Sequence, residues 1–289
     1  MKFFVIMFIT GIAACVLMFA LFRQLNHQIE FNSFETLGVE YVVPIQQLFE
    51  DALDYQAVVM NKQDGEALQQ TIDAHFEAVD KVDAQLGPIL NTSESSVSDK
   101  IDEIKVLWNN VKTSNTQQDY EQWIESIVTI YGNEIANNSN LILDPDLDTY
   151  YLMNTYLFLI PEFARSLNEL QLKLDNFRGT TLSLEQKMGI VALHHSIEEN
   201  MTRISSNFHT QVKHTADQTI FQSMEQVVLH IIEQSSTLLD DLEQQFIYSD
   251  VAVMDISHYS TQIEELMANI HDYHYEHADA LNLLIDIRI

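Results

Sequence analysis

The sequence predicts an all-α protein in which an N-terminal transmembrane helix is followed by an elongated antiparallel helical bundle. Three observations predict this class. The 289 residues include only 7 Gly and 4 Pro, which leaves little turn material for a sandwich, a barrel or a doubly wound sheet. Apolar residues recur every three to four positions, as they do on the buried face of a helix. One uncharged segment is long enough to cross a membrane.

Composition narrows the possible function classes. The net charge of −29 would repel phosphate backbones, so we expect no nucleic-acid partner. The single cysteine, Cys15, excludes an internal disulfide, a zinc ribbon and a CxxC redox pair. The sequence contains no GxG, GxxxxGK, HExxH or GxSxG motif, so the common phosphate-binding, metalloprotease and hydrolase signatures are absent. We therefore expect no cofactor, no bound metal and no enzymatic activity.

The first element is the uncharged run Phe3–Phe22, flanked by Lys2 and Arg23. Twenty helical residues rise about 30 Å, which matches a bilayer core. The apolar run continues past Cys15, which favours an uncleaved anchor over residues 1–23. Two alternatives remain: a lipoprotein with Ile12–Cys15 as its lipobox, and a cleaved signal peptide. All 43 acidic residues follow Arg23, so we expect a cytoplasmic N-terminus at a bacterial inner membrane and residues 24–289 in the periplasm.

Residues 24–289 read as a single helical-bundle domain. Long helices are expected over 24–62, 147–178 and 255–286, and shorter helices elsewhere. This mixture of long and short helices predicts two stacked four-helix modules. Buried stripes with helical spacing cover residues 68–86, 97–111, 120–135, 220–246 and 256–284. Short breaks make consecutive helices antiparallel neighbours. The clearest breaks are Lys62–Gly65, Gly87–Ser96, Thr113–Gln117, Asp144–Asp148 and Gly179–Ser183.

The break Asp144–Asp148 reads DPDLD, like the start of a calcium loop, but the sixth and twelfth positions are Thr149 and Thr155. An EF-hand requires Gly and Glu there. The sequence therefore favours a helix start, with Asp144 as the N-cap and Pro145 in the first position, over a bound cation.

The segments on both sides of this turn contain the candidate ligand site. Residues 150–160 are apolar except for Asn154 and Thr155, and Asn138 lies on the buried stripe of the preceding helix. Buried amides need a partner, which is either each other, a water or a ligand. Asn138, Asp148, Tyr151 and Asn154 together place polar groups among apolar neighbours, which is typical of a small-molecule pocket. Because the surroundings are acidic and tyrosine faces attract cations, we expect a cationic or neutral ligand.

Two further features carry expectations of their own. Pro161 should kink its helix, because it removes one backbone hydrogen bond. His271, His274 and His277 are three residues apart, which favours a solvated polar face over a shared metal.

At this point the sequence resembles a known family. Residues 138–153, NSNLILDPDLDTYYLM, and Ile160-Pro161-Glu162 are similar to a segment in the extracytoplasmic sensory regions of methyl-accepting chemotaxis proteins and allied histidine kinases and diguanylate cyclases. Gly38–Pro44 also resembles an element that follows the first membrane span of such receptors. The resemblance implies a helical, usually dimeric sensor between two membrane spans that binds a small metabolite.

The chain departs from this family in two places. Residues 54–57 read DYQA where the family commonly has a QHRG-like element. Residues 283–289 lie where a receptor would enter its second span, and no output domain follows them, so we expect either a sensor fragment or a chain without its own output. The sequence thus predicts a membrane-anchored sensor that binds a small molecule or a periplasmic protein. The alternative is an anchored structural or interaction protein without a small ligand.

Overall fold

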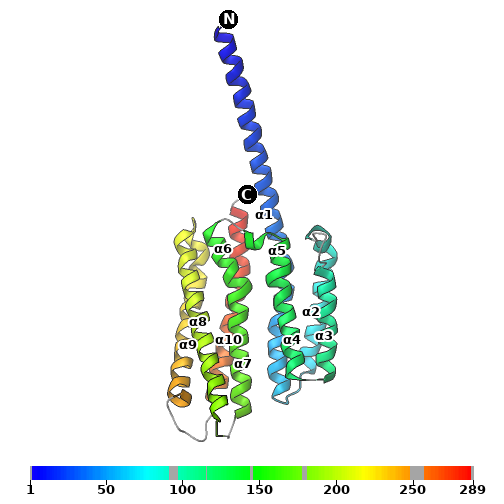
Figure 1. The fold of residues 1–289 in the computed structure, drawn as a ribbon, viewed down its shortest axis with the longest axis vertical. Coiled ribbons are helices and arrows are strands. Elements are labelled where there is room, and N and C mark those ends of the chain that lie inside the picture. The colour runs from blue at the N-terminus through cyan, green and yellow to red at the C-terminus, as the bar shows by residue number, and fades with distance from the viewer. Residues whose placement is uncertain are drawn as a thin grey trace.

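The computed structural model describes residues 2–90, 97–114, 116–143, 146–177, 181–247 and 257–287. Over these residues the chain is helical and contains no strand. The predicted all-α fold, an N-terminal apolar helix followed by an elongated antiparallel bundle, is confirmed (Figure 1).

The first helix, α1 (Lys2–Met60), runs for 59 residues without a break. At 1.5 Å per residue it is about 90 Å long. Its N-terminal part projects from the bundle (Figure 1), and the side chains described between Met7 and Glu30 are exposed. From Asn32 onward its inward face is buried. By length and composition this helix can cross a membrane, and its most apolar window is not buried in the protein.

The first group of helices is built around the C-terminal half of α1. After α1 ends at Met60, a short turn leads to Glu66, where the next helix begins, so the break predicted at Lys62–Gly65 is present. The following helices then run antiparallel to one another beside α1 (Figure 1). Most of the predicted stripe residues, including Ile72, Ile104 and Ile127, are buried, whereas Leu68 and Val82 are partly buried against the same core. The further elements of this group are α2 (Glu66–Leu90), α3 (Val97–Ser114), α4 (Gln117–Thr129), the π-helix η1 (Ile130–Ile135), α5 (Ala136–Asn138) and the 3₁₀ turn η2 (Leu141–Leu143).

The second group contains the rest of the chain. Its first helix is one continuous rod made of α6 (Leu147–Asn154), the π-helix η3 (Thr155–Leu159) and α7 (Ile160–Phe177). The remaining elements are α8 (Leu184–His214), the 3₁₀ turn η4 (Gln218–Phe221), α9 (Gln222–Leu242), the π-helix η5 (Glu243–Ile247) and α10 (Ser257–Ile287). The long helices expected over 147–178 and 255–286 are therefore present.

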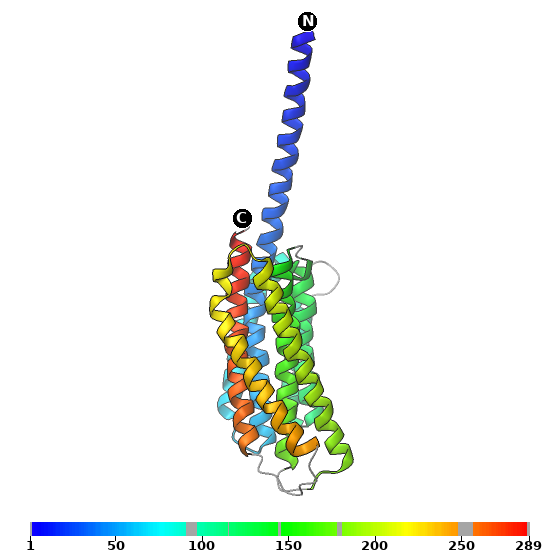
Figure 2. The ribbon, with the colours of Figure 1, turned by 90° about the vertical axis from the view of Figure 1, so that its left-hand side faces the viewer.

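The two groups lie side by side along the same axis, and both views show their helices covering the same height (Figures 1 and 2). The sequence instead predicted two modules stacked along the long axis, so that part of the prediction is wrong (Figures 1 and 2). Stacked modules that share long helices need some helices to run through both modules, whereas α8 and α10 have 31 residues each and α1 exceeds them only through its projecting part (Figure 1). The C-terminal end of α10 returns to the side from which α1 leaves (Figure 1).

Local sequence accounts for the helix boundaries. Ser183 forms a capping box with Gln186, which fixes the start of α8. Asp144 and Pro145 lie outside the described residues, so the predicted cap at Asp144 remains a prediction. However, α6 begins at Leu147 with Asp146 at its N-cap position, which is later than the sequence suggested.

Candidate functional site

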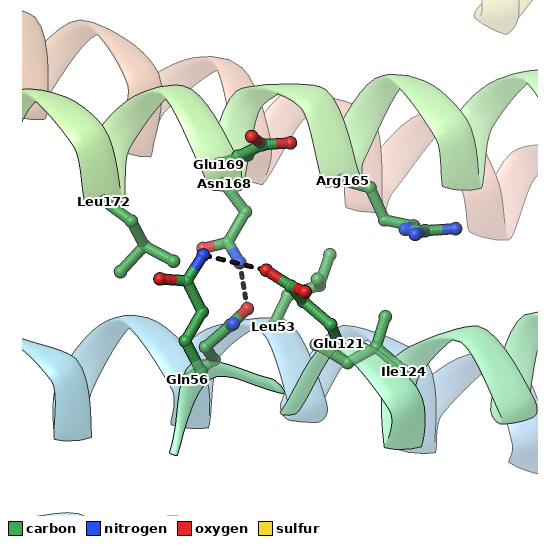
Figure 3. Close-up of a pocket in the computed structure, with 9 residues that line it drawn as sticks. Leu53, Gln56, Glu121, Ile124, Arg165, Asn168, Glu169 and Leu172 are labelled. Carbon is green, nitrogen blue, oxygen red and sulfur yellow. Dashed lines mark hydrogen bonds between the residues drawn. The ribbon is translucent and has the colours of Figure 1, made fainter. Parts of the chain in front are cut away.

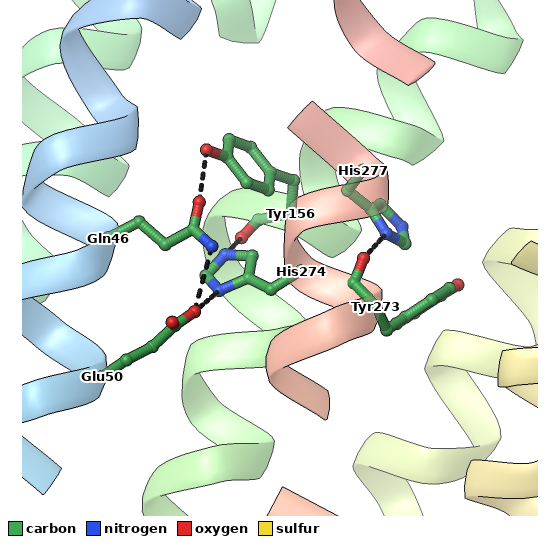
Figure 4. A network of polar contacts seen from close by, with 6 residues as sticks. All are labelled: Gln46, Glu50, Tyr156, Tyr273, His274 and His277. Carbon is green, nitrogen blue, oxygen red and sulfur yellow. Dashed lines mark hydrogen bonds and ion pairs between the residues drawn. The ribbon is translucent and has the colours of Figure 1, made fainter. Parts of the chain in front are cut away.

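A closed polar network lies in the core where α1, η3 and α10 meet (Figure 4). Glu50 on α1 is 5% exposed and His274 on α10 is 1% exposed. The His274 Nδ1 atom lies 3.0 Å from Glu50 Oε1. Its Nε2 atom lies 3.0 Å from the backbone oxygen of Tyr156. The network thus connects the helix that projects from the bundle to the helix that returns beside it.

Pro161 explains why the Tyr156 carbonyl can accept this bond. In η3 the N–H of Ile160 donates to the carbonyl of Thr155, five residues earlier. In the same π-helical register the carbonyl of Tyr156 would accept from residue 161, but proline has no N–H. His274 supplies the missing donor. The structure thus has a π-helical turn directly before Pro161, and the kink expected at Pro161 stays a prediction.

The geometry also shows where the Glu50–His274 pair holds hydrogen. A carbonyl oxygen can only accept, so His274 Nε2 must carry hydrogen. The Nδ1 atom then faces Glu50, so one further proton lies between Glu50 and His274. Gln46 completes the ring, because its Nε2 donates to Glu50 Oε1 at 3.0 Å and its Oε1 accepts from the Tyr156 hydroxyl at 2.8 Å. Glu50 and His274 therefore share one proton across two helices.

Electrostatics agree with this assignment. Burial raises the pKa of Glu50, but hydrogen bonding and charge from His274, with contributions from His271 and Gln46, outweigh burial and bring the pKa below its usual value. Two neighbouring carboxyl groups on α1 respond differently. Burial raises the pKa of both Asp51 and Asp54, although His75, whose Nδ1 lies 2.9 Å from Asp51, opposes the rise at Asp51.

The histidines of α10 are not a solvated face, so that prediction is wrong. His274 and His277 are buried, and His277 Nδ1 lies 2.8 Å from the carbonyl of Tyr273. The signal was present in the sequence, because the buried stripe through Ile263 and Ile270 continues through both histidines at the same spacing. Among the residues that the structure describes, no group of three or more His, Cys, Asp or Glu side chains is placed to hold a metal ion.

A cleft of about 370 Å³ opens between the two groups of helices, where α1, α4 and α7 adjoin (Figure 3). Its floor is formed by buried residues: an amide pair, in which Asn168 Nδ2 donates to Gln56 Oε1 at 2.7 Å, and three apolar side chains. Its rim is polar, and all of the rim residues are exposed except Arg165, which is half-buried. The apolar residues are Leu53, Ile124 and Leu172, and the rim residues are Gln117, Glu121, Arg165 and Glu169.

The four predicted site residues lie at the other end of the bundle, near the exit of α1, and do not share one cavity. Asn138 lines a cavity of about 500 Å³ with His27 and Glu30. Asn154 lines a separate cavity of about 180 Å³ together with Tyr150. Asp148 and Tyr151 belong to neither lining.

The contacts of three of these residues are local or interhelical. Asn154 Oδ1 accepts from Asn207 Nδ2 on α8 at 3.1 Å, and Asp148 accepts from the backbone N–H of Thr149 at 2.9 Å. The ring of Tyr151 meets that of Tyr150 edge to face, with their centroids 5.3 Å apart. Ligand binding by the four residues therefore stays a prediction.

Comparisons with protein-family models, with curated proteins and with solved structures found no match to this chain.

Proposed function

We propose that this chain is a membrane-anchored, extracytoplasmic sensor of a small molecule, with residues 3–22 spanning a bacterial inner membrane and the bundle in the periplasm. One observation carries the proposal: α1 provides both the apolar segment and a core helix of the bundle, without a break. A change in bundle packing therefore moves the membrane segment directly. The acidic excess beyond Arg23 and the resemblance to chemoreceptor sensory regions support the orientation and the class.

The network at Glu50 and His274 gives this sensor a coupling element. It connects α1 to α10, whose C-terminal end lies beside the exit of α1 (Figure 1). A ligand between the two groups of helices would bias their relative packing, and shifts of about 1–2 Å between packed helices are a common form of switching. The ligand needs only a different affinity for two packings. As in the receptors that the sequence resembles, we expect the chain to act as a homodimer.

The test is a thermal-shift screen of the full chain in lipid nanodiscs against amines, amino acids, organic acids and sugars. A ligand that binds only the folded state at 100 times its Kd stabilises the protein by about 2.7 kcal/mol. The proposal expects at least one compound to raise the unfolding temperature in a saturable manner. If no compound does, the chain is better explained as an anchored structural or interaction protein.

Two variants locate the ligand. Asn168→Ala alters the floor of the cleft, and Asn154→Ala alters the cavity near the exit of α1. A loss of binding in Asn168→Ala alone places the ligand in the cleft, whereas a loss in Asn154→Ala alone places it among the residues predicted from the sequence. If both variants bind as the parent does, neither location is the site.

A further inference from the structure

The rim of the cleft carries two charge pairs that are already formed. Arg165 Nη1 contacts Glu125 Oε2, which connects α7 to α4. Glu169 Oε1 lies 3.2 Å from Lys173 Nζ one turn along α7. Each of these four charges therefore has an opposite charge beside it, and the two pairs together add no net charge to the rim.

Glu121 differs from these residues. Its Oε1 atom accepts from the neutral Gln117 Nε2 at 2.8 Å, and no cationic side chain of the described ranges lies within ion-pair distance of it. Figure 3 shows the Glu121 carboxylate between α4 and α7, on the side that faces Asn168. The cleft thus presents one carboxylate whose charge is not balanced locally.

The floor beneath Glu121 combines apolar surface with amide groups. The bond between Asn168 and Gln56 uses the Asn168 nitrogen and the Gln56 oxygen. The remaining amide atoms are one acceptor, Asn168 Oδ1, and one donor, Gln56 Nε2. Leu53, Ile124 and Leu172 supply the apolar part of the lining.

We propose that this cleft binds a small organic cation that consists of a primary ammonium group on a short apolar chain. The ammonium group donates to Glu121 and to Asn168 Oδ1, and the chain lies against Leu53, Ile124 and Leu172. A carboxylate ligand would have to compete with Glu125 for Arg165 while lying near Glu121. This inference rests on the proposed sensor function and names the class of its ligand.

The experiment compares three compounds of equal chain length on the full chain in nanodiscs, at pH 7 and constant ionic strength: n-butylammonium, γ-aminobutyrate and butyrate. We expect n-butylammonium to bind most tightly by calorimetry and to raise the unfolding temperature, and butyrate to do neither. Glu121→Gln removes the charge at an exposed position that does not threaten folding. It should weaken n-butylammonium binding about tenfold or more, because hydrogen bonds to charged groups are among the stronger ones.

Glu198→Gln is the matched control, since Glu198 is exposed on α8 and does not line the cleft. It removes the same charge from a protein of net charge −29 and should bind n-butylammonium as the parent does. Equal affinity of Glu121→Gln and parent, equal losses in both variants, or tightest binding of butyrate or γ-aminobutyrate would overturn the assignment. If the screen finds only ligands of another class, the proposed sensor function is supported and this inference is wrong. If the screen finds no ligand, both the sensor function and this inference are wrong.

Discussion

His277 offers a quantitative test of the packing of α10. The side chain is fully buried and its Nδ1–H donates to the carbonyl of Tyr273. Its Nε2 atom has no hydrogen-bond partner among the described residues. Protonation would place a charge in the core and leave the new N–H without an acceptor. Burial, with a smaller contribution from the charge of His274, accordingly lowers the pKa of His277 from 6.5 to about 3.

The sign and size of the effect follow from linkage. Because the pKa is lower in the folded state, the unfolded chain binds the proton first as the pH falls. The contribution of His277 is therefore complete above about pH 6.5 and is lost progressively as the pH falls toward 3. For one site this loss is about 2 kcal/mol between pH 7 and pH 5. The raised pKa values of Asp51 and Asp54 act in the opposite sense, so the measurement must isolate His277.

His277→Asn isolates it, because the asparagine Nδ2 replaces the imidazole Nδ1 as donor to Tyr273 and does not titrate. We compare urea unfolding of parent and variant, each as the full chain in nanodiscs and followed by circular dichroism. The stability difference between them should be about 2 kcal/mol smaller at pH 5 than at pH 7. His195→Asn, at an exposed position, controls for the loss of one histidine. The same difference at both pH values would refute the buried, neutral assignment of His277.

Four other outcomes are expected. Glu50→Gln leaves the buried proton of the network without its carboxylate and should cost about 3–5 kcal/mol at pH 7 in urea unfolding; a cost below about 1 kcal/mol would mean that the pair is not formed. Gly38→Ala should destabilise by about 1–3 kcal/mol, because its Cβ would lie 2.2 Å from Ser139 Oγ. Gly189→Ala, whose Cβ would meet nothing closer than 3.9 Å, should instead stabilise by about 0.5–1 kcal/mol. Mass spectrometry of the membrane fraction should find the intact N-terminus, and a mature chain that begins with a lipidated Cys15 would contradict the anchor.

The helices could be predicted from the sequence because their buried stripes persist over many turns. Besides the start of α6, two boundaries differ from the prediction. The break expected from Gly87 begins later, because α2 continues through Pro88 to Leu90. The break between α8 and η4, at Thr215–Asp217, was not predicted and contains neither Gly nor Pro. The chain leaves the helix there because the Asp217 side chain accepts from the backbone N–H of Thr219 at 3.0 Å, a local turn that competes with the helix.

The cleft could not be predicted from the sequence, because its residues lie far apart along the chain. Gln56 and Asn168 form the floor of the cleft although they are 112 residues apart, and helical periodicity does not reveal which helices face each other. The role of Pro161 also required the tertiary structure, because only the packing of α10 shows that His274 donates to the carbonyl that the proline leaves free. By contrast, the burial of His274 and His277 could have been predicted from the sequence, because both lie on the buried stripe of their helix.

Under the proposed function, ligand binding in the bundle displaces α1 relative to α10 at the end from which α1 projects. Its most direct test is a distance measurement by double electron–electron resonance between spin labels at Leu25→Cys and Leu283→Cys, in a Cys15→Ser background and in nanodiscs. Both positions are more than half exposed. We expect saturating n-butylammonium, or the strongest ligand of the screen, to shift the mean distance between the two labels by about 1–2 Å. An unchanged distance distribution in a sample whose unfolding temperature shows that ligand is bound would contradict it.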